Sequence, residues 1–107
     1  MCPLLQTDQD VEFRRSLLLA AQVALLGEVS GAIRGVTIGW TPAEIVLRAI
    51  VHGLVDDDDQ ESMECVGSEI IAGFPTHLIA VEVMRVDAPV PIKPHGLNAW
   101  VFMRKER

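Results

Sequence analysis

The sequence has few cysteines, few aromatic residues and few basic residues, and each scarcity excludes a class of protein. Cys2 and Cys65 are its two cysteines in 107 residues, too few for a disulfide framework. Two free thiols are typical of a reducing compartment, so we expect a cytoplasmic protein. Aromatic residues make up 5%, and 9 lysines and arginines stand against 15 acidic residues, a formal charge of -6. Because nucleic-acid binding needs a basic surface and stacking aromatics, we expect no nucleic-acid partner.

The sequence also lacks an apolar run long enough to cross a bilayer. The run Leu17–Leu26 follows Arg14 and Arg15, an arrangement that resembles the start of a signal peptide. However, Asp8 and Asp10 lie upstream, where a signal peptide is basic. We therefore interpret this run as a buried helix and expect no membrane partner.

What the sequence does have is a high apolar content, 50% of residues, in a chain the size of one domain, residues 1–107. Hydrophobic spacing predicts a helix from about Asp8, capped by Thr7 or Asp8, to Leu26, with Gly27 after it. Alternation predicts strands at 33–40, about 44–55, about 78–87 and about 98–104. A second helix should be capped by Asp56 and ended by Gly73 and Pro75.

This pattern predicts an α+β fold in the order α-β-β-α-β-β. Short connections favour a two-layer domain, with a four-stranded antiparallel sheet and both helices on one of its faces. Within the last strand, alternation places Trp100 and Phe102 on one side and Val101 and Met103 on the other.

The second face of the sheet is predicted to be more apolar than a face that meets water. Such a patch is typical of an interface, and a symmetric homodimer is the commonest way to bury one. An alternative is that loops or the first helix wrap around part of this face. The interface residues that the pattern predicts are Val46, Ile50, Leu78, Met84, Val101 and Met103.

The acidic run Asp56–Asp59 is the most conspicuous local feature. Consecutive carboxylates at a helix start point in different directions and lack the alternation and central glycine of an EF-hand loop. We therefore interpret the run as a cap and a dipole-stabilised first turn. A second interpretation is an anionic patch for a basic protein partner. That patch would consist of Asp57, Asp58, Asp59 and Glu61.

No other constellation predicts chemistry. The histidines, His52, His77 and His95, lack the spacing of metal ligands, and no serine lies in a nucleophile elbow. We therefore expect no metal, no cofactor and no catalytic residue. Four charged strand residues are predicted to form ion pairs at an end of the sheet, with a polar site as the alternative reading. These residues are Arg48, Arg85, Asp87 and Arg104.

Several stretches resemble a group of short bacterial proteins of unassigned function, some of which look like immunity proteins that neutralise a toxin. The matching stretches lie at 24–28, 57–61, 69–72, 85–89 and 100–106, together with the strand that ends at Trp40. The resemblance implies an acidic α+β protein that acts by protein contacts and supplies no catalytic residues. Where that group has an aromatic-rich second strand, this chain has Arg48-Ala49-Ile50-Val51-His52.

We therefore expect a non-enzymatic protein that acts through protein-protein contacts, as an immunity-type inhibitor. The alternative is a small enzyme or a ligand-binding domain with its site on the open sheet face. A third reading is a purely structural oligomer.

Overall fold

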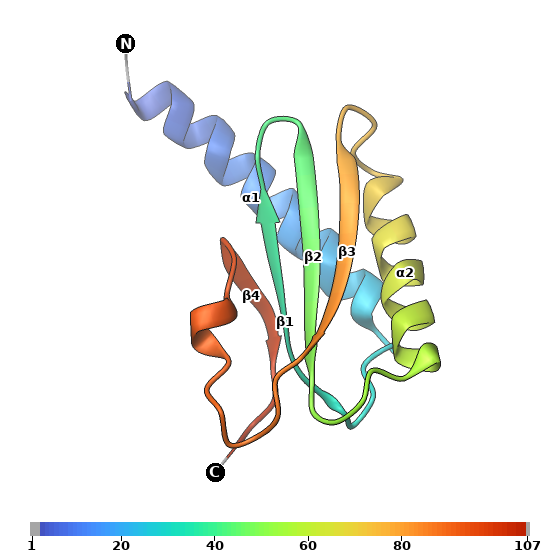
Figure 1. Cartoon of the computed structure of the whole chain (residues 1–107). Coiled ribbons are helices and arrows are strands. Elements are labelled where there is room, and N and C mark those ends of the chain that lie inside the picture. The colour runs from blue at the N-terminus through green and yellow to red at the C-terminus, as the bar shows by residue number, and fades with distance from the viewer. Residues whose placement is uncertain (1–2, 107) are drawn as a thin grey trace.

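The computed structural model describes the backbone of residues 3–106 and the side chains of residues 11–106. Two helices lie on one face of a four-stranded sheet, in the predicted order α-β-β-α-β-β (Figure 1). The helices are α1 (Pro3–Leu25) and α2 (Asp57–Ile71). The strands are β1 (Ile33–Trp40), β2 (Glu44–Val51), β3 (Leu78–Arg85) and β4 (Ala99–Met103), with a short 3-10 helix, η1 (Lys93–His95), before β4.

Helix α1 begins earlier than predicted. Its backbone is helical from Pro3, so the predicted start at Asp8 and the cap at Thr7 or Asp8 were wrong. Proline suits a first turn because it lacks the amide hydrogen that would be unpaired there. Gly27 has a positive φ of 80°, as expected of the residue that turns the chain after a helix. Cys2, one of the two cysteines, lies outside the described residues.

Helix α2 begins as the sequence predicts. Asp56 is in an extended conformation, and its Oδ1 accepts a hydrogen bond from the Asp58 amide at 2.8 Å. The Asp56 carbonyl also accepts from the Gln60 amide at 2.9 Å. The predicted N-cap is therefore confirmed, and the helix ends at Ile71, just before Gly73.

The sheet is mixed, so the prediction of a fully antiparallel sheet was wrong. Strands β1 and β2 form the expected antiparallel hairpin, but β2 and β3 are parallel, with Glu44 opposite Leu78 and Val51 opposite Arg85. The reason lies in α2, whose 15 residues extend about 22 Å. That length returns the chain to the end at which β2 began, and a strand that starts there must run parallel.

The strand order β3-β2-β1-β4 places β3 and β4 at opposite edges. The connection at 86–98 must therefore cross the sheet, and it does so on the face without helices (Figure 1). Ile92 from this connection packs with Ile50 and Val86, and with Met84 and Trp100, in a small second core. Part of the predicted open face is therefore covered by a loop, as the alternative interpretation expected.

A bulge in β4 changes which side its residues face. Gly35 lies opposite Met103 and Val36 opposite Phe102, but Thr37 lies opposite Trp100, which leaves Val101 as an extra residue. An extra residue reverses the alternation beyond it. Consequently Phe102 packs on the main core with Val101, while Trp100 belongs to the second core. The predicted pairing of Trp100 with Phe102 on one side was wrong.

The main core lies between the helices and the sheet. It joins residues of α1 and α2 to the face of β1, β2 and β4 that the helices cover. Its fully buried members include Leu17, Val36, Ile38, Leu47 and Met63. Gly67 of α2 faces β3, where a Cβ atom would lie 2.6 Å from Val81 Cγ2, so the helix sits very close to this edge strand.

Replacing the N-cap should destabilise the fold. We expect Asp56→Ala to lower the free energy of unfolding by about 1 kcal/mol, because the Asp58 amide loses its acceptor. Asp58→Asn should be nearly neutral, since it weakens both the helix-dipole attraction and the repulsion among neighbouring carboxylates. Urea unfolding of both variants measures this, and equal large losses would contradict the capping role.

Gly35 should tolerate no side chain. A Cβ atom there would lie 2.8 Å from both Ile92 Cδ1 and Trp100 Cζ3, so we expect Gly35→Ala to cost about 1–3 kcal/mol through overpacking. Gly31→Ala is the control, because a Cβ at position 31 meets nothing within 4 Å. Thermal unfolding decides the matter, and an unchanged midpoint for Gly35→Ala would refute the close approach.

Candidate functional site

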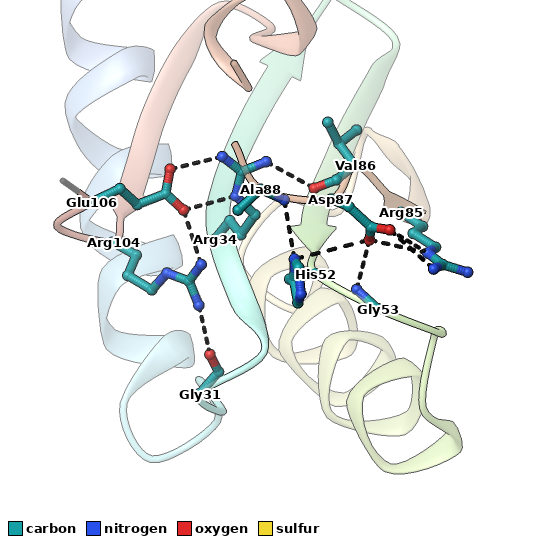
Figure 2. A network of polar contacts seen from close by, with 10 residues as sticks. All are labelled: Gly31, Arg34, His52, Gly53, Arg85, Val86, Asp87, Ala88, Arg104 and Glu106. Carbon is teal, nitrogen blue, oxygen red and sulfur yellow. Dashed lines mark hydrogen bonds and ion pairs between the residues drawn. The ribbon is translucent and has the colours of Figure 1, made fainter. Parts of the chain in front are cut away.

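A buried arginine organises the polar end of the sheet. Arg34 lies where β1 pairs irregularly with β2: Ile33 is opposite Val51, and Gly35 is opposite Ile50. Arg34 is therefore the extra residue of a bulge, and its side chain is only 2% exposed. Its guanidinium donates to both carboxylate oxygens of Glu106 at 2.7 Å and to the Val86 carbonyl at 2.8 Å (Figure 2).

The end of the chain is tied to this arginine. Arg104 donates to Glu106 Oε2 at 3.0 Å and to the Gly31 carbonyl at 2.9 Å, so Glu106 lies between two guanidinium groups. The hydrogen bonds from Arg34 are the main reason that the pKa of Glu106 falls from 4.5 to about 2. The same bonds raise the pKa of Arg34 above its usual value.

A second carboxylate holds the end of β3. Asp87 accepts from Arg85 at 2.9–3.2 Å and from the Gly53 amide at 2.8 Å (Figure 2). The Arg85 hydrogen bonds are the main reason that the pKa of Asp87 falls from 3.8 to about 2. Nearby, His52 Nδ1 accepts from the Ala88 amide at 3.0 Å and lies 4.0 Å from Asp87 Oδ1. The contact with Ala88 requires the hydrogen of a neutral His52 ring to be on Nε2.

This network is built to hold segments together rather than to move protons. Both carboxylates stay ionised far below neutral pH, so neither is poised as a general acid or base. A shallow crevice beside Arg34 is lined partly by Ala88, Pro89 and Pro91. Among the side chains described, those of residues 11–106, no three His, Cys, Asp or Glu are grouped so that they could hold a metal ion.

The charged strand residues predicted to form ion pairs do so in two places. Arg85 pairs with Asp87, and Arg104 with Glu106. Arg48 lies elsewhere, donating to Glu82 at 3.3 Å and to the carbonyl of His95 at 2.9 Å. The sequence pattern did not single out Arg34 or Glu106. However, an arginine in register with the buried residues Val36 and Ile38 indicates a charge that needs a partner.

The six predicted interface residues do not share one surface. Ile50 is fully buried in the second core, with half-buried Met84 against it, and Val101 packs on the main core. Leu78 and Met103 are exposed, at 72% and 43%, but they lie on strands at opposite edges of the sheet. Val46 is half-buried on β2. The bulge in β4 and the crossing connection are what separate these residues.

Three of the four residues of the predicted acidic patch are exposed. Asp57, Asp58 and Glu61 are exposed on α2, but Asp59 is only 7% exposed and cannot be part of an outer surface. No lysine or arginine lies between Arg48 and Arg85. The helix therefore presents carboxylates without neighbouring cations of its own. Other acidic residues in this interval are Glu64, Glu69 and Glu82.

Fold and site together define a small acidic protein with a two-layer α+β fold and a mixed sheet. Ion pairs hold residues 104–106 against the sheet, and an acidic helix is exposed. The model of one family, MafI2 immunity protein, matches residues 14–106, and the chain belongs to this family. The resemblance to immunity proteins seen in the sequence is thus confirmed. A search of curated proteins gave no match. No helix in the described part of the chain combines the length and the apolar character that a membrane span requires.

Loss of the Glu106 carboxylate should change how stability depends on pH. A carboxylate whose pKa is lower in the folded chain adds stability above its unfolded pKa, here near 4.5, and loses it as pH falls toward 2. We expect Glu106→Gln to unfold at lower urea concentration at pH 7, with a smaller difference near pH 3. Glu82→Gln, the control, should change little at either pH. An equal loss of stability at both pH values would contradict the role of an ionised Glu106 carboxylate bound by Arg34.

Proposed function

We propose that this protein is an immunity-type inhibitor that neutralises a toxin by binding it, without catalysis of its own. The observation that supports this proposal is the match to the MafI2 immunity protein family over residues 14–106. A protein of this kind needs an accessible surface that is complementary to its partner. It does not need a reactive group.

The surface that fits this role best is the exposed acidic side of α2, made by Asp57, Asp58 and Glu61. These carboxylates lie in the first turns of the helix, and the Asp58 amide is already bound by Asp56. The acidic side chains are therefore free of the capping role and remain available to a partner. We propose that the partner is a basic protein surface, because opposite charge accelerates encounter and fixes orientation.

The rival reading, an enzyme or ligand-binding domain on the open sheet face, has less support. The connection at 86–98 occupies part of that face, where Ile92 and Trp100 pack against the Gly35 position. The carboxylates at the sheet end, Asp87 and Glu106, are held by Arg85 and Arg34.

We further propose that residues 1–107 form a single domain that works in the bacterial cytoplasm and associates as a homodimer. Because Ile50 is fully buried and Leu78 and Met103 lie at opposite edges of the sheet, we place the dimer contact on another part of the molecule. Leu78 is the most exposed of those residues, so a substitution there tests whether a dimer forms through the sheet.

The inhibitor proposal is tested by capturing the partner from the native bacterium with the tagged protein, and then measuring association rates with the purified partner at two ionic strengths. The test variant is Asp58→Asn/Glu61→Gln. We expect it to associate about tenfold more slowly at low salt and to approach the wild-type rate at high salt, because salt screens exposed charges.

The matched control is Glu44→Gln/Glu82→Gln, which removes the same number of exposed carboxylates from the sheet. It should keep close to the wild-type rate. Equal slowing in both variants would show that overall charge, and not the acidic side of α2, guides the partner. Capture of no toxic protein would count against the inhibitor role.

A further inference from the structure

Helix α1 has an apolar face that no part of the described chain covers. Leu19, Val23 and Leu26 are 64%, 55% and 77% exposed, although Leu17, Ala21 and Ala24 on the other side are buried in the main core. At 100° per residue, Leu19 and Val23 lie about 40° apart, opposite the core side. Leu26 is in the turn that directly follows α1. We call Leu19, Val23 and Leu26 the α1 stripe. Exposed apolar residues that lie in line are typical of an interaction site.

Two hollows flank the stripe. One hollow, between α1 and α2, is lined by Ser16, Leu19, Ala20, Val23 and Glu69. The other lies at the end of α1, where Leu26 and Gly27 meet Val101 and Phe102. Val101, which the sequence assigns to an interface, therefore lies beside the stripe and not on the open sheet face.

The charges along α1 make the stripe complementary to itself. Exposed Arg15 lies one turn before Leu19 on the same side of the helix. Half-buried Glu28 lies in the turn after α1, where its amide donates to the Leu25 carbonyl at 3.0 Å. If two copies of α1 cross antiparallel between Leu19 and Val23, Arg15 of each copy comes opposite residues 26–28 of the other. Each end of the contact then pairs a cation with an anion. A contact related by two-fold symmetry makes every such pair twice.

We propose that the α1 stripe is the dimer interface, and that its occupant is a second copy of this chain packed antiparallel. This inference rests on the proposed homodimer and is independent of the proposed inhibition. The exposed carboxylates that we propose bind the toxin belong to α2. The toxin contact and the dimer contact therefore use different helices.

Sedimentation at micromolar concentration tests the location of the interface. We expect the wild type to sediment as a species with twice the 11.7 kDa mass of the chain. Leu19→Glu should weaken the dimer more than about tenfold, because it places a charge in the centre of the contact. Leu78→Glu is the matched control on the sheet edge and should leave the dimer intact. Circular dichroism checks that both variants fold, and Leu19→Ala is a milder variant that also weakens the dimer.

A charge exchange tests the antiparallel arrangement. Arg15→Glu alone should weaken the dimer, and Arg15→Glu/Glu28→Arg should restore it. Dissociation by Leu78→Glu but not by Leu19→Glu would overturn the location while the homodimer proposal survives. A monomeric wild type would overturn both, and toxin binding in the capture experiment would be unaffected. Failure of the charge exchange to rescue would overturn the antiparallel pairing.

Discussion

The Arg34 guanidinium is the contact on which the arrangement of the strands depends. It binds the carbonyl of Val86, where the chain leaves β3, and the carboxylate of Glu106, where the chain leaves β4. These two strands are at opposite edges of the sheet, and β1, which contains Arg34, lies inside it. Because the arginine is buried, loss of its partner would leave an uncompensated charge, so one side chain fixes two distant segments.

The hydrogen bond from Arg34 to Val86 and the absence of a side chain at Gly35 determine the position of the crossing connection. With Val86 held at one end, the chain passes over β1, and Gly35 leaves the space that Ile92 and Trp100 fill. The face without helices thereby acquires a small core of its own. A sheet that would otherwise offer a broad apolar surface keeps only separate exposed residues there, such as Leu78 and Met103.

Charge is divided in the same way between two regions of the molecule. Arg34, Arg85 and Arg104 form ion pairs with carboxylates in the network at the sheet end, so these positive charges are neutralised within the chain. The exposed side of α2 has carboxylates and no basic residue of the helix itself. The exposed carboxylates of α2 therefore contribute to the overall charge of -6 without a neighbouring cation on the helix. Membership of the immunity protein family fits a molecule that acts through its exposed surface.

The sequence by itself determined the local features. Apolar spacing identified both helices and all four strands, and Asp56 was recognisable as a cap because its oxygen needs only the amide two residues ahead. The stretches that resemble immunity proteins were also readable without a fold. Such features depend on interactions between residues that are close in the sequence, so the order of residues is enough to predict them.

Only the tertiary structure decided the pairing. Whether β3 runs parallel to β2 depends on the path of α2, and the sides of Trp100 and Phe102 depend on a bulge at Val101 that forms only against β1. The partnership of Arg34 with Glu106 joins residues 72 positions apart, and Asp59 is buried although its acidic neighbours are exposed. Contacts at such separation are fixed by which segments pack together, a choice that no local pattern of residues encodes.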